Sequence, residues 1–142
     1  MKTYVLDASV AAKWFLRVRE PLAEEAVGLL RRHAKAEVDF LVPDLFFAEF
    51  ANIFWKAQRL GRCDGELADA AVHEIVDKGL PTYPSAPLLQ PALQIARAFE
   101  RTVYDSLYVA LAVHTNSDFV TADEKLAHSS AGQLPVVWLG YL

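Results

Sequence analysis

The sequence predicts an α/β fold, a three-layer α/β/α sandwich around a central parallel sheet of about five strands. The main observation is that short apolar segments alternate with helical segments along the chain. Such alternation is typical of a parallel sheet that helices cover on both faces. The second observation is composition, because 54% of the 142 residues are hydrophobic and 23% are charged. We therefore expect a single domain, residues 1–142, with a substantial core and no disordered bulk.

Each expected strand is a short apolar segment. The strands are expected over residues 4–6, 40–42, 80–84, 118–121 and 136–139. Two prolines in the third segment cannot donate to a sheet ladder, which indicates an edge or irregular strand. Because crossovers between parallel strands are right-handed, the carboxyl ends of all strands meet at one edge of the sheet. Ligands in such folds bind at that edge, in the crevice where the strand order reverses.

Helical segments with recognisable ends lie between these strands. The helices are expected over about residues 8–15, 21–36, 45–60, 65–78, 88–99, 104–115 and 123–128. Pro21 suits a first helical turn, and Asp44 and Asp64 are placed to cap the third and fourth helices. Gly61 and Gly79 end those two helices, because glycine readily adopts the left-handed conformation found after a helix C-terminus.

Four acidic residues are expected at the carboxyl edge of this sheet. Asp7 follows the first strand directly, and Asp123 lies two residues beyond the strand that ends at Thr121. Glu49 lies about one turn into the third helix and Asp105 lies in the first turn of the sixth helix, so both can point towards the same crevice.

The surroundings of Glu49 and Asp105 point to a metal. Both residues lie in helices that are apolar almost all round, and such helices are normally buried. Buried carboxylates are costly unless they are paired or bind a metal, and two of them about 4 Å apart repel by roughly 4 kcal/mol. The neighbouring segments offer few cations, since Lys13 and Lys125 are the nearest basic residues in sequence. A hard divalent cation, Mg²⁺ or Mn²⁺, would resolve the conflict because such ions prefer carboxylate oxygens.

A purely structural role is open for three of these acids taken singly. Asp7 and Asp123 can each serve as a helix N-cap, and Asp105 in a first helical turn complements the helix dipole. Glu49 lies past the capping positions of its helix, so neither explanation applies to it.

Charge and cysteine content narrow the classes of function. The formal net charge of −4 argues against a protein that binds duplex nucleic acid by neutralising many phosphates, so any contact with nucleic acid would be local. Cys63 is the only cysteine, which excludes an intrachain disulfide and a thiolate zinc site. No apolar run approaches the ~18 residues of a membrane span. We expect a cytoplasmic protein with no membrane partner.

The segments around the four acids resemble, in order, the motifs of the PIN-domain family, and specifically the ribonuclease toxins of VapC type. Residues 5–9, Val-Leu-Asp-Ala-Ser, resemble the opening motif, and Pro43 followed by residues 48–52 resembles the second motif. Residues 102–112 form the most specific segment, and residues 118–123 resemble the closing motif. Each motif is weak alone, whereas the ordered set is specific and covers nearly the whole chain.

The resemblance implies a PIN-like fold that hydrolyses single-stranded or looped RNA with Mg²⁺ or Mn²⁺. It makes all four acids catalytic and metal-binding, with Asp7 and Asp105 as the main ligands and Glu49 and Asp123 completing the site. Metal-activated water would attack the phosphate in line and leave a 5′-phosphate and a 3′-hydroxyl. The polar residues that would orient the carboxylates are Ser9, Asn52 and Thr121. Ordinary capping or turn hydrogen bonds would explain each of these three equally well.

The resemblance also implies partners, namely a VapB-type antitoxin and a second copy of the chain in a homodimer. The third helix carries more aromatic residues than one buried stripe needs, so most belong to the core and some are expected at such a contact. These residues are Phe46, Phe47, Phe50, Phe54 and Trp55. Four arginines could flank the edge and bind RNA phosphates, although a solvated face is the simpler explanation for most of them. They are Arg17, Arg19, Arg97 and Arg101.

Three other interpretations fit the residues less well. A phosphoacceptor receiver domain needs an acidic pair after the first strand, and a phosphatase of the haloacid dehalogenase type needs Asp-x-Asp there. The chain has Asp7-Ala8-Ser9 at that place. The remaining alternative is a catalytically silent PIN fold that serves as an RNA- or protein-binding module, and the presence of all four acids argues against it.

Overall fold

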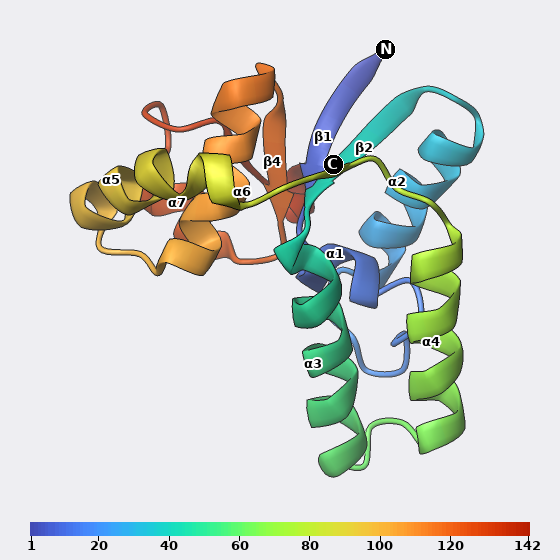
Figure 1. The fold of residues 1–142 in the computed structure, drawn as a ribbon. Coiled ribbons are helices and arrows are strands. Elements are labelled where there is room, and N and C mark those ends of the chain that lie inside the picture. The colour runs from blue at the N-terminus through green and yellow to red at the C-terminus, as the bar shows by residue number, and fades with distance from the viewer.

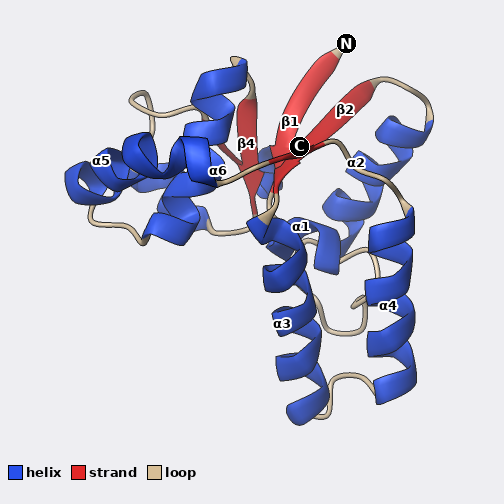
Figure 2. Ribbon diagram, in the orientation of Figure 1, coloured by secondary structure: helices blue, strands red, loops and turns tan.

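Five parallel strands form one sheet in a computed structural model that describes residues 1–142 (Figures 1 and 2). The strands are β1 (Lys2–Leu6), β2 (Val38–Pro43), β3 (Thr82–Tyr83), β4 (Asp118–Thr121) and β5 (Val136–Trp138). Their order is β3-β2-β1-β4-β5, and every neighbouring pair is parallel. The predicted parallel sheet of five strands is therefore confirmed. The proline-flanked β3 is a two-residue strand at an edge, as its prolines indicate.

Seven α-helices and two short 3₁₀ helices connect the strands. The α-helices are α1 (Ala8–Ala12), α2 (Ala23–Ala34), α3 (Leu45–Arg59), α4 (Gly65–Asp77), α5 (Leu89–Phe99), α6 (Val103–Thr115) and α7 (Glu124–Ser129). The 3₁₀ helices cover Ala86–Leu88 and Leu139–Tyr141. None of these helices combines the length and the apolar character that crossing a membrane requires.

The first two helices are shorter than the sequence predicts. α1 ends at Ala12, because residues 13–15 form turns instead of continuing the helix. α2 begins at Ala23 and not at Pro21. Leu22 has a left-handed backbone with a φ of 62°, so Pro21 precedes the helix and does not occupy its first turn.

Asp44 does not cap α3, contrary to the prediction. Its backbone is already helical, with a φ of −62°, and its side chain makes no capping hydrogen bond. Its carboxylate instead accepts hydrogen bonds from the hydroxyl of Ser85 and, at 3.2 Å, from the N–H of Ser85. Asp44 thereby ties the start of α3 to the segment after β3. Asp64 does cap α4, because it accepts from the N–H of Leu67 at 2.8 Å.

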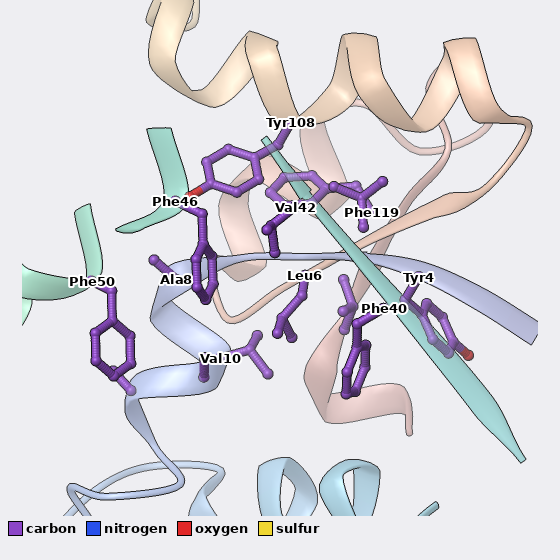
Figure 3. Packing of buried hydrophobic residues seen from close by; sticks show 14 of the residues in the cluster. Tyr4, Leu6, Ala8, Val10, Phe40, Val42, Phe46, Phe50, Tyr108 and Phe119 are labelled. Atoms are coloured by element: carbon purple, nitrogen blue, oxygen red, sulfur yellow. The ribbon is translucent and has the colours of Figure 1, made fainter. Parts of the chain in front are cut away.

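Helices cover both faces of the sheet, which confirms the predicted three-layer arrangement (Figure 1). On one face, the ring of Tyr108 in α6 stacks on Phe119 of β4 with centroids 5.0 Å apart. On the other face, Trp14 after α1 packs against Phe40 of β2 at 5.8 Å. Figure 3 shows Tyr108 and Phe119 on one side of β1 and Leu6 and Phe40 on the other. All five side chains belong to the buried apolar core.

The strand order reverses at β1, which has β2 on one side and β4 on the other. The chain runs from β1 through β2 to the edge strand β3 and then returns to the far side of β1 as β4. A crevice is expected between the carboxyl ends of β1 and β4 for this reason. The antiparallel pair α3 and α4 projects from this edge of the sheet, with the first turns of α3 nearest to the strands (Figure 1).

Candidate metal site

The residues singled out from the sequence surround one cavity at the carboxyl ends of β1 and β4. Its volume is about 480 Å³. Its walls are formed by Asp7, Ala8, Ser9, Glu49, Asn52, Ile53, Lys56, Asp105, Thr121, Ala122, Asp123 and Leu126. The structure thus brings together all four acids and all three polar residues named beside them. Their roles in holding a metal stay predictions.

Asp7 is a half-buried acid whose two carboxylate oxygens both accept hydrogen bonds. It follows β1 directly and caps α1, because its Oδ1 accepts from the N–H of Ser9 at 3.3 Å. Its Oδ2 accepts from the hydroxyl of Thr121 at 2.7 Å. Burial raises the pKa of Asp7 to about 6, against the hydrogen bonds from Thr121 and Ser9 that lower it, and the charge of Glu49 raises it too. An ionised carboxylate in this place is costly unless a cation compensates it.

Thr121 links the two strand ends that meet at the cavity. Its hydroxyl donates to Asp7 and accepts from the N–H of Asp123 at 3.1 Å. This is the contact that an orienting role for Thr121 requires. The hydroxyl of Ser9 is buried without a hydrogen-bond partner, and Asn52 lines the cavity from α3 without bonding to any of the acids.

Glu49 is held by Tyr108. It lies one turn into α3, and its Oε1 accepts from the Tyr108 hydroxyl of α6 at 2.6 Å. Burial raises the pKa of Glu49, the bond from Tyr108 lowers it, and the charge of Asp105 raises it. Burial and the charges of Asp7 and Glu49 raise the pKa of Tyr108 itself, so Tyr108 is a neutral donor. Glu49 therefore has a neutral protein partner, which the apolar sequence around it did not indicate.

Asp105 and Asp123 share one cation, Arg101. The Nη2 of Arg101 lies 3.3 Å from Oδ2 of Asp105 and 2.9 Å from Oδ2 of Asp123. The side chain of Asp105 is 38% exposed, so its predicted burial is wrong, because the buried face of α6 begins only at Ser106. The Oδ1 of Asp123 caps α7 by accepting from the N–H of Leu126 at 3.1 Å.

Lys13, one of the nearest basic residues in sequence, belongs to a different cluster. Its buried ammonium donates to Glu20 at 2.6 Å and to the carbonyl of Pro21 at 2.7 Å. Arg62 also pairs with Glu20, at 2.5 Å. The basic residue in the cavity wall itself is Lys56 of α3.

The donor atoms of the cavity fit a hard divalent cation. They are the oxygens of four carboxylates with the unpartnered Ser9 hydroxyl and the Asn52 amide, and no thiolate or imidazole is among them. Such donors suit Mg²⁺ and Mn²⁺. With Glu49 held by Tyr108 and two aspartates held by Arg101, no three acidic side chains surround a common point closely enough to hold one ion. An ion held by three or more of these acids would require rearrangement of their side chains.

Comparison with known proteins identifies the family. The sequence model of the PIN domain matches residues 4–131, a range that contains the whole cavity wall. The chain belongs to the PIN-domain family. This PIN domain is also 33% identical to Ribonuclease VapC3 of Pyrobaculum aerophilum over 129 residues, which cover 89% of this chain and 93% of that protein. The predicted PIN-domain family of VapC type is confirmed, and the chain is a nuclease of that family.

Solved structures share the fold of this PIN domain. PAE2754 from Pyrobaculum aerophilum aligns with a TM-score of 0.67 and 21% identity, covering 99% of this chain and 92% of the other. VapC20 of Mycobacterium tuberculosis, a sarcin-ricin loop cleaving toxin, aligns with a TM-score of 0.65 and 18% identity, covering 92% and 95%. VapBC2 from Rickettsia felis, bound to a DNA fragment from its promoter, gives a TM-score of 0.62 and 14% identity, covering 96% and 98%.

Sequence reasoning missed three contributions to the site of this PIN domain. Tyr108 was not considered, although it lies three residues after Asp105 and so on a neighbouring face of the same helix. Arg101 was predicted either to bind RNA phosphates or to lie on a solvated face, although it lies four residues before Asp105, the spacing of a helical ion pair. Lys56 lies seven residues after Glu49, which places it two turns further along the same face of α3.

Proposed function

We propose that this PIN-domain protein is a Mg²⁺- or Mn²⁺-dependent endoribonuclease and the toxin of a type II toxin–antitoxin pair. The observation that carries the proposal is the meeting of Asp7, Glu49, Asp105 and Asp123 around one cavity. The names of relatives support the substrate, since VapC3 is a ribonuclease and VapC20 is a sarcin-ricin loop cleaving toxin. We place the protein in the cytoplasm, where its RNA substrates would be met.

The four acids approach the cavity from four elements, namely the end of β1, α3, α6 and the start of α7. Asp7 and Asp105 would be the main ligands, and Glu49 and Asp123 would complete the site. When bound, the ion supplies a nucleophile at neutral pH and offsets the charge that develops on the phosphate. The cavity wall contains no histidine or thiol, so the contribution of the four carboxylates would be to hold and orient the cation that faces the reacting phosphate.

Hydrogen bonds to the acids would fix the direction of their oxygens. Thr121 holds one oxygen of Asp7, and Tyr108 holds one oxygen of Glu49. Because each bond occupies only one of the two carboxylate oxygens, the other oxygen of Glu49 stays available to a ligand. Contacts of this kind restrict the carboxylates to the geometry in which they act, which is why their loss usually weakens a metal site.

RNA would be bound locally and not through a broadly basic surface, because the net charge is −4. Lys56 lines the cavity and offers a cation to a phosphate. Trp55 directly precedes Lys56 on α3 and is 52% exposed, and the guanidinium carbon of Arg59 lies 4.9 Å from the centre of its ring. Aromatic rings and guanidinium planes of this kind stack on unpaired bases. These features support single-stranded or looped RNA as the substrate.

A VapB-type antitoxin and a second copy of the chain are the proposed partners. The Rickettsia felis structure supports an antitoxin, since it contains VapBC2 bound to promoter DNA. Among the aromatic residues of α3 considered for such contacts, Phe46, Phe50 and Phe54 are fully buried in the core. The half-buried Phe47 and the exposed Trp55 are accessible, so a partner on this helix and RNA would compete for Trp55.

The test uses purified protein freed of any antitoxin. Mn²⁺-dependent RNA cleavage should vanish in Asp7→Asn and Asp105→Asn while both variants stay folded, and the products of the wild type should carry a 5′-phosphate. Asp69→Asn, which removes an exposed acid of α4, should keep wild-type activity. If the wild type cleaves no RNA in Mn²⁺ and its melting temperature does not rise with Mn²⁺, the nuclease proposal fails and a non-catalytic binding module takes its place.

A further inference from the structure

The backbone of Arg101 is fixed by the turn that joins α5 to α6. Glu100 ends α5 with a left-handed backbone, at a φ of 53°, and the N–H of Arg101 donates to the carbonyl of Ala96 at 3.2 Å. Thr102 then caps α6 by accepting from the N–H of Asp105 at 3.1 Å. Hydrogen bonds therefore fix the main chain on both sides of Arg101, and its side chain extends from this fixed backbone towards Asp105 and Asp123.

The guanidinium of Arg101 bridges the first turn of α6 and the start of α7. A single nitrogen, Nη2, contacts Oδ2 of Asp105 at 3.3 Å and Oδ2 of Asp123 at 2.9 Å. The Nε of Arg101 is buried and has no hydrogen-bond partner. An arginine usually binds a carboxylate through two parallel hydrogen bonds. In this bridge the Nε of Arg101 makes no hydrogen bond. A cation that binds Asp105 and Asp123 more strongly than the guanidinium does can therefore displace the guanidinium.

Both acids that Arg101 contacts belong to the proposed metal site. The ion would need oxygens that the guanidinium now occupies, and a divalent cation next to a guanidinium is repelled by it. The side chain of Arg101 is 25% exposed, so it has a route to solvent. Contact between Arg101 and both acids is therefore incompatible with full engagement of these acids by an ion.

We propose that Arg101 is an internal counter-cation, which holds Asp105 and Asp123 in the metal-free protein and is displaced when a divalent cation binds. This inference rests on the proposed function, because it takes the two acids to be metal ligands. As a consequence, half-saturation of the site requires a higher concentration of Mg²⁺ or Mn²⁺ in the wild type than in a variant that lacks the Arg101 side chain. In this role Arg101 is a positioning residue that acts through the acids.

The test is a titration of metal-free protein with Mn²⁺ alone, read by the electron paramagnetic resonance signal of free Mn²⁺. The variants are Arg101→Gln, which removes the charge, and Arg101→Lys, which keeps it without the planar guanidinium. The matched control is Arg97→Gln, which removes an exposed positive charge from α5 that takes part in no ion pair. Melting temperatures in EDTA report the stability of the metal-free fold.

We expect Arg101→Gln to bind Mn²⁺ roughly tenfold more tightly than the wild type, with a smaller gain for Arg101→Lys and no gain for Arg97→Gln. The melting temperature of Arg101→Gln in EDTA should fall, because two acids lose their counter-charge. A residue that only ties α6 to α7 would lower this melting temperature without tightening Mn²⁺ binding. Equal or weaker binding of Mn²⁺ by Arg101→Gln overturns the inference.

The inference and the proposed function fail in different ways. If the wild type binds Mn²⁺ and cleaves RNA but Arg101→Gln binds Mn²⁺ no more tightly, only the inference fails. If Arg101→Gln binds Mn²⁺ and the wild type binds none, the inference holds in its strongest form. If neither protein binds Mn²⁺, the metal dependence in the proposed function fails and the inference fails with it.

Discussion

The hydroxyl of Thr121 lies 2.7 Å from Oδ2 of Asp7, although the two residues are 114 positions apart in the chain. The bond joins the carboxyl end of β4 to that of β1, next to the point where the strand order reverses. The same hydroxyl accepts from the N–H of Asp123, and Thr121 is fully buried. One side chain thereby positions two of the four acids of the cavity.

Thr121→Val removes this hydroxyl and keeps the shape of the side chain. We expect the free energy of unfolding of the metal-free protein to fall by about 1–3 kcal/mol, because the hydrogen bonds to Asp7 and from Asp123 are both lost, at about 0.5–1.5 kcal/mol each. Urea denaturation in EDTA measures the loss. Thr121→Ser keeps the hydroxyl and should retain the hydrogen bonds, so equal stability of the Val and Ser variants would contradict the prediction.

Asp7→Asn should stabilise the metal-free protein at neutral pH, although we expect the same substitution to abolish RNA cleavage. Burial raises the pKa of Asp7 from 3.8 to about 6, so the folded protein binds this proton more tightly than the unfolded chain does. Protonated Asp7 contributes up to about 3 kcal/mol to the free energy of unfolding. This contribution is fully present below about pH 4 and is lost as the pH rises through about 6. Asparagine does not ionise and avoids this loss.

The measurement is the difference in free energy of unfolding between Asp7→Asn and the wild type, in EDTA, at about pH 4 and at about pH 7.5. The difference should move in favour of Asp7→Asn at the higher pH. Asp69→Asn, an exposed acid, serves as the control and should show little change. A difference that does not depend on pH would mean that Asp7 is not a buried ionised group in the metal-free protein.

Tyr108→Phe should weaken metal binding at the proposed site without disturbing the core. The substitution removes the donor to Glu49 and keeps the ring that stacks on Phe119. We expect Mn²⁺ affinity or RNA cleavage to fall roughly 10- to 100-fold, because Glu49 is no longer oriented. The control is Tyr104→Phe in the same helix, where the side chain is 61% exposed. Wild-type Mn²⁺ affinity and cleavage in Tyr108→Phe would show that this hydrogen bond has no part in the site.

Glu20→Gln should destabilise the loop between α1 and α2. Hydrogen bonds and charges from Lys13 and Arg62 lower the pKa of Glu20 in spite of its burial, which acts to raise it. This stabilisation is present above the ordinary pKa of 4.5 and is lost as the pH falls through the lowered value. Without the carboxylate, Lys13 is a buried charge whose partner is gone, so we expect a loss of about 3 kcal/mol at neutral pH. Glu24→Gln, at an exposed position, should change little.

The place of each acid could be predicted because it depends on where a strand or helix begins. In a parallel sheet, a residue just after a strand lies at the carboxyl edge whatever the packing of its neighbours. Asp7 and Asp123 were placed in this way, and the helical spacing of Glu49 and Asp105 directed them to the same cavity. The positions of the strands and helices in the sequence and the right-handedness of the crossovers were sufficient to place the four acids.

The partners of the acids could not be predicted, because they depend on how distant helices pack. The contact from Tyr108 to Glu49 spans 59 positions and exists only because α6 and α3 both border the cavity. Asp44 has the sequence position of a cap, yet the placement of the edge strand β3 brings Ser85 to its carboxylate. Tertiary packing determines both of these contacts, and local sequence propensity does not predict them.

The strand order also determines the stage of synthesis at which the four acids can meet. Asp7 and Glu49 lie in the first 50 residues, whereas Asp105 and Asp123 lie after residue 100. A ribosome delivers the chain in that order, so a nascent chain carries two of the acids beside a sheet that still lacks β4. Only after β4 has left the ribosomal exit tunnel and paired with β1 can the four acids meet. In the proposed nuclease, the four acids would therefore come together only late in the synthesis of the chain, when β4 joins the sheet.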